Sequence, residues 1–529
     1  MLPRPRTFPA GLALVLSALP ILGSGGACAE ASPAAPEWFP PSNERPALDR
    51  TYRPSGHQAA GDVFVHLFEW RWADVAAECE SVLGPAGWTA VQVSPPQEHA
   101  IVAGLPWYQR YQAVSHSVAR SRSGTEAEFR DMVARCRAAG VGIYVDAVVN
   151  HMSAGDGTGS NGTVYRKYEY PGLFAIADFH APCSVSNYQS AENVQDCELF
   201  GLADLHTGKP EVRGKIAAYL LSLVRMGVAG FRLDAAKHIQ PVELDDILDR
   251  VNQGAAAAGL PLPYFFGEVI DHGGEAVKAA DYYGLGYGTG GAADLTEFRF
   301  RGVAEKFLGA SGQKVSDLRT LSESGWGLMP ADKAVVFLEN HDTQREQGQL
   351  GYRHGNVFRL ANVFMLAQPY GYPSVMSSFA FDLGRPGGRD MGPPSTPTGE
   401  TRPAACAART EAAVVGDWVC EHRDPVIAAM VGFRKAVAGA PLAAWWDNGG
   451  NAVAFSRGDR GFVALSREAA PVSLDVATPL QPGTYCDLLT GGKAGSACRG
   501  RQVVVASDGH VRLDLASDTG IAIHSGSRL

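Results

Sequence analysis

The sequence predicts an α/β protein: a (β/α)₈ TIM barrel with a small domain inserted after the third strand and a C-terminal antiparallel β-sandwich. Two observations predict the barrel. Apolar stretches of strand length alternate with amphipathic helices, an order that produces a parallel sheet. Several of these strands also end in polar residues, and a barrel of this kind builds its site at the carboxyl ends of its strands. A doubly wound open sheet is the alternative, but no glycine-rich phosphate loop follows the first strand.

The clearest repeat unit is a helix at 211–227 followed by a strand at 228–234. The helix places apolar side chains at helical spacing, and Gly227 is a typical C-terminal residue. Because side chains alternate along a strand, Arg232 and Asp234 are expected on the same face. The same reasoning predicts a helix at 128–140, and further strands at 87–100, 141–151, 262–272 and 333–342.

The N-terminus has the pattern of a secretory signal. Residues 1–29 combine Arg4 and Arg6 with an apolar stretch and a small-residue cleavage site, and the apolar stretch is too short to be a membrane anchor. Lipid attachment at Cys28 is an alternative. Residues 30–53 are rich in Pro, Ala and Ser and predict an extended lead-in segment. We therefore expect a secreted, extracellular protein.

Changes in composition and hydrophobic pattern divide the remaining chain into domains. We expect barrel segments at 54–149 and 204–438, because the stretch between them is too long for a simple loop and predicts an inserted domain at 150–203. Short alternating strands at 439–529 predict the β-sandwich. The net charge of −9 argues against a nucleic acid or an anionic membrane as the partner. We expect a monomer.

Cysteine spacing predicts four disulfides. Without Cys28, eight of the nine cysteines remain, an even number in an exported protein. Short separations favour three local pairs and leave a fourth, and no pair has the two-residue spacing typical of a zinc site. The predicted pairs are Cys183–Cys197, Cys406–Cys420, Cys486–Cys498 and Cys79–Cys136.

Three carboxylates follow different predicted barrel strands: Asp234, Glu268 and Asp342. Converging carboxylates indicate either metal binding or glycoside hydrolysis. Hydrolysis with retention uses one carboxylate as nucleophile and a second, protonated one as acid, about 5–5.5 Å apart. Arg232, on the same face as Asp234, is expected to hold that nucleophile ionised.

The stretches DAVVNH (146–151), GFRLDAAKH (230–238), GEVI (267–270) and FLENHD (337–342) occur in this order. Together they resemble the four signature regions of the α-amylase family, glycoside hydrolase family 13, in particular the animal-type enzymes and their bacterial relatives. The resemblance continues at 63–80, 105–115, 197–205 and 365–378, and the cysteines fall where that type has disulfides.

The resemblance implies a role for each residue of the site. Asp234 is the implied nucleophile, Glu268 the general acid/base, and Asp342 the carboxylate that stabilises the transition state. The implied substrate contacts are Trp107, Tyr108, Tyr111, His151, Arg232, Lys237 and His341. Without the family context, the histidines read as core residues, Lys237 as a solvated surface residue and Tyr108 equally well as part of a packed loop.

The resemblance also implies a structural Ca²⁺ between the barrel and the inserted domain. Its side-chain ligands would be Asn150 and Asp204, which carry the hard oxygen donors that Ca²⁺ prefers. Its backbone ligands would be the carbonyl oxygens of Gln195, where relatives usually have arginine, and of His238.

Chloride is not expected as a cofactor. Chloride-activated relatives hold the anion with an arginine, an asparagine and a second cation. Arg232 and Asn340 match the first two, but Ser374 stands at the third position, and one arginine shared with Asp234 compensates a buried anion poorly. Replacement of the missing cation by a Lys or Arg from another loop is the alternative.

We therefore predict a calcium-dependent, retaining endo-α-amylase whose partner is a polysaccharide such as starch, glycogen or a maltooligosaccharide. One alternative is a transglycosylase or maltooligosaccharide-forming enzyme of the same family. Another is a noncatalytic glucan-binding or transporter-associated homologue, which would usually lack a catalytic carboxylate or carry a membrane span.

Overall fold

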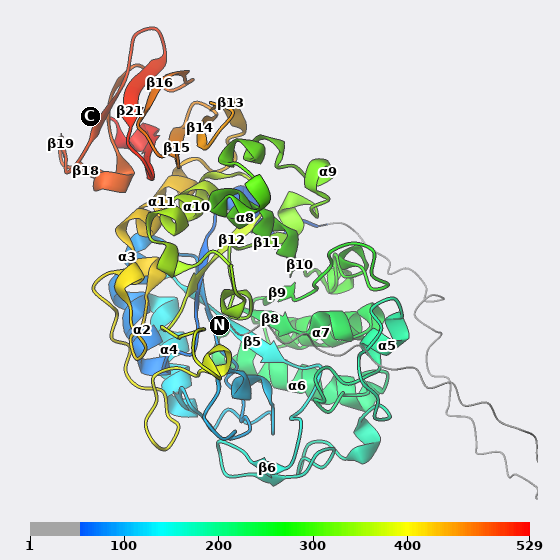
Figure 1. Cartoon of the computed structure of the whole chain (residues 1–529). Helices are drawn as coiled ribbons and strands as arrows, with labels where there is room; N and C mark the ends of the chain where they lie inside the picture. The colour runs from blue at the N-terminus through cyan, green and yellow to red at the C-terminus, as the bar shows by residue number, and fades with distance from the viewer. Residues whose placement is uncertain (1–52) are drawn as a thin grey trace, which may run out of the picture. The chain divides into compact units, whose positions relative to one another are not determined.

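The computed structural model describes residues 53–529 (Figure 1). The predicted signal peptide, with Cys28, and the lead-in segment up to residue 52 lie outside the described residues. Among the helices of the described part, none combines the length and the apolar character that a membrane crossing requires.

Eight parallel strands form a closed barrel in the order β1-β12-β11-β10-β9-β8-β5-β2, which confirms the predicted fold class. Five of the strands lie within predicted ranges, and β10 is one that the sequence pattern did not identify. The strands are β1 (Phe64–Leu67), β2 (Ala90–Val93), β5 (Gly142–Val148), β8 (Gly230–Asp234), β9 (Tyr264–Gly267), β10 (Ala293–Thr296), β11 (Ala334–Val336) and β12 (Tyr372–Ser377).

Helices follow the strands, and their ends have identifiable causes. In α4 (Glu126–Ala138) Thr125 and Glu128 form a capping box, which satisfies backbone N–H groups of the first turn. In α6 (Pro210–Met226) the proline occupies the first turn, and Gly227 ends the helix in a left-handed conformation. The other helices of at least seven residues are α2 (Trp72–Glu78), α7 (Pro241–Ala257), α8 (Gly302–Leu308), α10 (Asn356–Ala367) and α11 (Pro425–Ala436).

Strand register decides which side chains meet inside the barrel. On β8, Phe231 and Leu233 are buried in the main hydrophobic core, and Arg232 and Asp234 alternate with them. Arg232 stands in register with Asp146 of β5, so these two side chains are neighbours on adjacent parallel strands.

Between β5 and α6 the chain forms short elements: β6 (Gly157–Thr158), β7 (Val164–Tyr165) and α5 (Ala191–Gln195). This excursion follows the third barrel strand, as predicted. Further short elements are α1 (His57–Ala60), α3 (Gly84–Ala86), α9 (Glu323–Trp326), β3 (Arg120–Ser121) and β4 (Gly124–Thr125).

The C-terminal strands, coloured orange to red in Figure 1, form two four-stranded antiparallel sheets around a hydrophobic core of their own. The first sheet contains β13 (Leu442–Asp447), β14 (Ala452–Arg457), β15 (Gly461–Ser466) and β22 (Thr519–His524). The second contains β16 (Val472–Ala477), β21 (His510–Leu515), β20 (Gln502–Val505) and β17 (Gly483–Cys486), with β18 (Lys493–Ala494) and β19 (Ala497–Cys498) forming a small hairpin.

All four predicted disulfides are present. Cys79–Cys136 joins the helical layer after β1 to α4, and the other three close short loops. Disulfides of this number are typical of proteins that fold in an oxidising compartment.

Candidate active site

Arg232 is the centre of the polar cluster at the carboxyl end of the barrel. One of its terminal nitrogens donates to Asp146 at 2.6 Å and to Asp234 at 2.8 Å, and the other lies 2.6 Å from Glu268. Its side chain is only 4% exposed. Because one guanidinium contacts two of the predicted catalytic carboxylates, Asp234 and Glu268 converge as the sequence predicted.

Asp146 is a functional-site residue that the sequence reasoning missed. Its carboxylate is fully buried and accepts hydrogen bonds from the hydroxyl of Tyr111 at 2.9 Å and from the side-chain amide of Gln92 at 3.3 Å. It therefore orients both the arginine and the tyrosine. A signal was present in the sequence, because Asp146 follows four apolar residues on a predicted barrel strand.

Charge in this cluster is unbalanced. Three carboxylates surround one guanidinium, an excess of two negative charges when all are ionised. Burial raises the pKa of Asp234 well above its usual range; Arg232 opposes this rise, and the charges of Glu268 and Asp146 add to it. The cluster therefore retains a proton more readily than separate carboxylates would.

Glu268 is held by the backbone as well as by the arginine. Its second carboxylate oxygen accepts a hydrogen bond from the backbone N–H of Ala235 at 2.9 Å. Ala235 has a left-handed backbone conformation directly after β8. The strained turn after Asp234 thus aims an N–H group at the neighbouring carboxylate, and this fixes the relative placement of the two acids.

Asp342 lies beyond β11 and is the most accessible of the predicted catalytic carboxylates, with 45% of its side chain exposed. Its backbone N–H donates to the side chain of Asn340 at 3.1 Å, and its carboxylate lies 3.4 Å from the ring of His341. Desolvation and the charge of Glu268 raise the pKa of Asp342 to about 7. Its exposed carboxylate can contact a ligand bound in the site.

An aromatic wall, formed by Trp107, Tyr111 and His341, lies beside Asp342. The rings of Tyr111 and His341 stack at a centroid distance of 5.0 Å, and Trp107 contacts both edge-on. The ring of Tyr108 lies edge-on to that of Trp107, with 6.0 Å between the ring centroids. Burial lowers the pKa of His341 well below its usual range, so its ring is neutral near pH 7.

His151 lies against the same wall. One of its ring nitrogens is 3.0 Å from the backbone carbonyl of Tyr111, and burial lowers the pKa of His151 to about 4. A neutral imidazole that hydrogen-bonds a carbonyl must carry its proton on that nitrogen. The structure therefore supports His151 as a fixed, uncharged polar group in the site.

Lys237 is buried, which excludes the alternative that it is a solvated surface lysine. Its ammonium pairs with Glu275, donates to the backbone carbonyl of Ile270 at 2.6 Å, and lies 4.9 Å from the ring centre of Tyr188. Glu275 and Tyr188 were not predicted as site residues, because nothing in their local sequence distinguishes them from loop residues.

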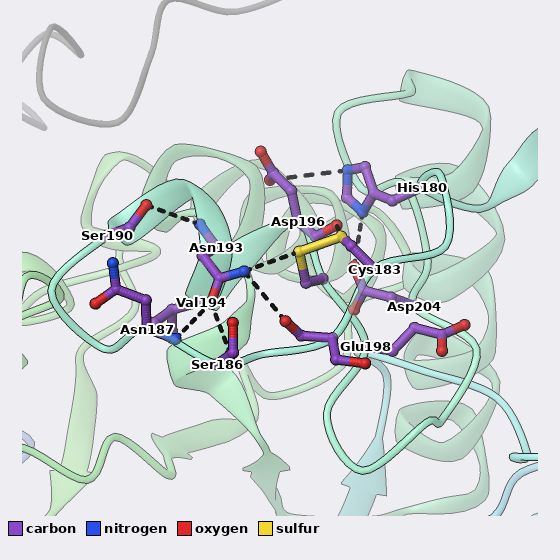
Figure 2. Close-up of a disulfide and its surroundings, with 12 residues drawn as sticks. His180, Cys183, Ser186, Asn187, Ser190, Asn193, Val194, Asp196, Glu198 and Asp204 are labelled. Carbon is purple, nitrogen blue, oxygen red and sulfur yellow. Dashed lines mark hydrogen bonds and ion pairs between the residues drawn. A yellow bond between two sulfur atoms is a disulfide. The ribbon is translucent and has the colours of Figure 1, made fainter. Parts of the chain in front are cut away.

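A second polar group joins the inserted segment to the barrel. The side-chain amide of Asn150 donates to Asp204 at 3.3 Å, and His180 lies 2.7 Å from the other oxygen of Asp204. Figure 2 shows His180 between Asp204 and Asp196. Burial raises the pKa of Asp204 to about 7 although His180 lowers it.

The two segments that carry the predicted backbone ligands contact each other. The ring of His238 is 2.7 Å from the carbonyl oxygen of Val194, the residue before Gln195. The side chain of Gln195 points elsewhere, because its amide donates to the hydroxyl of Tyr282 at 2.9 Å. Contacts thus join Asn150 to Asp204, and the segment of His238 to that of Gln195. Among the described residues, no cluster of three or more His, Cys, Asp or Glu side chains has metal-binding geometry.

Comparison with known families places these residues in context. Residues 87–373 match the model of the α-amylase catalytic domain, and residues 445–526 match the model of the α-amylase C-terminal all-β domain. The chain belongs to the α-amylase family.

Individual relatives agree with this assignment. The chain is 42% identical to an α-amylase of Oryzias latipes over 88% of this chain and 94% of the relative, and 42% identical to the pancreatic α-amylase of Sus scrofa over 89% and 96%. The crystal structure of wild-type α-amylase I from Eisenia fetida is similar, with a TM-score of 0.80 and 38% identity over 90% of this chain and 98% of that one. Membership of this family makes the chain a glycoside hydrolase.

Proposed function

We propose that this α-amylase family member is an endo-acting, retaining enzyme that hydrolyses internal α-1,4-glucosidic bonds of starch, glycogen and maltooligosaccharides. The observation that carries the proposal is the single guanidinium of Arg232 that contacts both Asp234 and Glu268. This shared contact would hold the proposed nucleophile and the proposed acid side by side. A mutant of the similar Eisenia fetida enzyme was crystallised with maltohexaose, which supports an α-1,4-glucan as the ligand.

The proposed reaction has two displacements. In the first, a carboxylate oxygen of Asp234 bonds to the anomeric carbon while Glu268 donates its proton to the departing glycosidic oxygen. In the second, Glu268 takes a proton from water, and the water oxygen displaces Asp234 from the anomeric carbon. Net retention follows because the configuration inverts twice.

The surrounding residues have proposed roles in binding. Asp342 stabilises the positive charge that develops on the sugar ring, and His151 and His341, both neutral, hydrogen-bond sugar hydroxyls at the cleavage point. Trp107, Tyr108 and Tyr111 provide ring faces for the C–H surface of glucose. Lys237, held by Glu275, contacts the sugar on the leaving-group side.

Digestion of soluble starch tests this function. An endo-acting, retaining enzyme lowers viscosity and iodine staining before reducing ends accumulate, and NMR shows the α-anomer as the first product. A transglycosylase would instead form longer oligosaccharides from maltotriose, and a noncatalytic homologue would bind starch without producing reducing ends.

We also propose the predicted domain division, secretion and monomeric state. The four disulfides support folding in an oxidising compartment. The separate hydrophobic core of the C-terminal sheets supports a third domain after the barrel. Size-exclusion chromatography with light scattering tests the monomer.

The residues around Asp204 fit a structural Ca²⁺. The donor set consists of hard oxygen atoms: the side chains of Asn150 and Asp204 and the backbone carbonyls of Gln195 and His238. Asp204 is 2% exposed, and a neighbouring cation would compensate the burial of its charge. When bound, the ion would supply charge neutralisation and a cross-link between the inserted segment and the barrel, and no part of the proposed reaction passes through it.

Chelation is expected to lower the thermal midpoint, because a ligand that binds only the native state stabilises it. At a free Ca²⁺ concentration one hundred times its dissociation constant, the lost stabilisation is about 2.7 kcal/mol. The measurement is a melting curve by circular dichroism in EDTA and after Ca²⁺ is restored. Asp204→Asn is the control: it should melt lower in Ca²⁺ and should not respond to EDTA. An equal response of both proteins to EDTA would contradict the site.

Added chloride is expected to leave activity unchanged. A cavity in the barrel interior is lined by Arg232, Asn340 and Ser374, and Arg232 is the only Lys or Arg among its lining residues. That arginine already contacts three carboxylates, and the buried carboxylate of Glu339 also lines the cavity. The measurement is activity against pH in chloride-free acetate, with and without NaCl at matched ionic strength and fixed calcium. Strong activation by chloride would contradict this expectation.

A further inference from the structure

The apolar side chain of Phe200 is almost fully exposed to solvent. Its exposed fraction is 91%, compared with 72% for Val164 and 71% for Ile176, the next most exposed large apolar residues among those described. A phenylalanine in water exposes a large apolar surface with no compensating contact. A bound ligand that covers the ring would remove this apolar surface from water.

The backbone at Phe200 is also unusual. Phe200 and Gly201 have φ values of 52° and 76°, and the N–H of Leu202 donates to the carbonyl of Leu199 at 3.0 Å. Two central residues with positive φ define a type I′ turn, in which Asn-Gly is the preferred pair. Phenylalanine adopts this conformation at a cost. The residue thus violates two local preferences at once, and such violations concentrate at functional sites.

The turn has a firmly held base. Cys197 forms a disulfide with Cys183, and the buried carboxylate of Glu198 pairs with Lys167 at 2.8 Å. Figure 2 shows this disulfide with Glu198 and Asp204 nearby. An anchored base means that the position of Phe200 is set by the fold.

Backbone pairing connects the turn to the site. Asp204 forms an antiparallel bridge with His151, and the N–H of Met152 donates to the carbonyl of Ala203 at 2.9 Å. His151 in turn lies against the carbonyl of Tyr111. Phe200 is therefore at the tip of a turn that extends from the segment paired with His151.

We propose that Phe200 is a stacking platform for a glucosyl unit of a long α-1,4-glucan, remote from the cleaved bond and on the His151 side of the site. The proposal rests on the proposed function. An exposed ring offers the flat apolar face on which the C–H face of a pyranose packs, and desolvation of that ring then occurs only when a chain long enough to reach it is bound.

Phe200→Asn tests the proposal, because asparagine is preferred at this turn position. We expect the variant to keep or raise the thermal midpoint. Its kcat/KM for maltoheptaose should fall about three- to tenfold, and the loss should grow from maltotriose to maltoheptaose. Phe200→Trp, which keeps a ring, should restore the length dependence. Val504→Ala, at a 56% exposed apolar residue of the C-terminal sheet, is the matched control and should match the wild type at every length.

The outcomes separate the possibilities. An unchanged length dependence in Phe200→Asn overturns the proposal. A loss that is equal at all lengths and accompanied by a lower midpoint also overturns it, because that result indicates a structural role. If the wild-type protein hydrolyses none of the maltooligosaccharides, the proposed function fails first. In that case the affinity for maltoheptaose is compared between Asp234→Asn and the double variant Asp234→Asn/Phe200→Asn. Weaker binding by the double variant supports Phe200 as a stacking platform, and equal binding overturns the proposal.

Discussion

We expect hydrolysis of soluble starch to fall by at least about a thousandfold in each of three variants: Asp234→Asn, Glu268→Gln and Asp342→Asn. When residues act as one catalytic unit, the loss of a single member costs nearly as much activity as the loss of all of them. Each change keeps the side-chain volume and removes only a charge or a proton. The fold and glucan binding should remain. The measurement is kcat on purified protein, with the thermal midpoint and starch affinity as checks on folding.

The variants also distinguish the nucleophile from the acid. With an aryl maltoside whose leaving group needs no protonation, Glu268→Gln should retain a measurable burst of released phenol, whereas Asp234→Asn should show none. Asp131→Asn, an exposed carboxylate on α4, is the matched control and should behave as the wild type. Substantial turnover by Asp234→Asn would contradict its assignment as the nucleophile, and a burst from Asp234→Asn but not from Glu268→Gln would exchange the two roles.

Arg232→Gln is expected to have the second large effect, this time on both stability and activity. The substitution leaves the buried Asp146 and Asp234 and the partly buried Glu268 without their common cation. Removal of one partner from a buried ion pair costs about 3–5 kcal/mol of unfolding free energy. Activity should also fall, because Asp234 and Glu268 lose the group that holds them in place.

The pH dependence of this loss has a defined sign. Without Arg232, the pKa of Asp234, already raised by burial, rises further in the folded state. A carboxyl with a raised folded pKa contributes stability that is present below its unfolded pKa of about 3.9 and is lost as the pH rises through its folded pKa. The difference between wild type and variant should therefore be smallest near pH 4 and should increase toward pH 7.

Urea unfolding at pH 4, 5.5 and 7 measures this difference. Arg130→Gln is the control, because Arg130 forms an exposed i,i+4 pair with Glu126, and surface pairs contribute at most about 1 kcal/mol. A destabilisation by Arg232→Gln that is constant with pH, or no larger than that of Arg130→Gln, would contradict the central role of the arginine.

The sequence predicted the barrel because its evidence is local. Helical periodicity, strand length and Gly227 appear within single segments, and the alternation of segments implies a parallel sheet. β10 escaped prediction because, unlike the equally short β2 and β9, it carries two buried polar residues, Asp294 and Thr296, within four positions. Such a short mixed segment has no periodicity that distinguishes it from a loop.

Part of the candidate site was also predicted, because the evidence for those residues is local in the sequence. Asp234 and Glu268 could be placed together because each follows a buried strand, and parallel strands end at the same edge of a barrel. Tyr188 and Glu275 were missed because they contact Lys237 from segments distant in the sequence. Asp146 lies on a predicted barrel strand, and only its pairing with Arg232 depends on the register between strands. Tyr188, for example, approaches Lys237 from the inserted segment. No local pattern encodes such a contact.

The sequence by itself determined the alternation of strands and helices, five of the eight barrel strands, the cysteine pairs and the residues at the ends of those strands. These features depend on composition and spacing along the chain. Only the tertiary structure decided that one guanidinium contacts three carboxylates, that Lys237 is buried, and that Phe200 is exposed to solvent in a turn with positive φ. These properties depend on strand register and on packing between distant segments. Burial and charge balance in turn set the protonation of the carboxylates, and they exist only when the chain has folded.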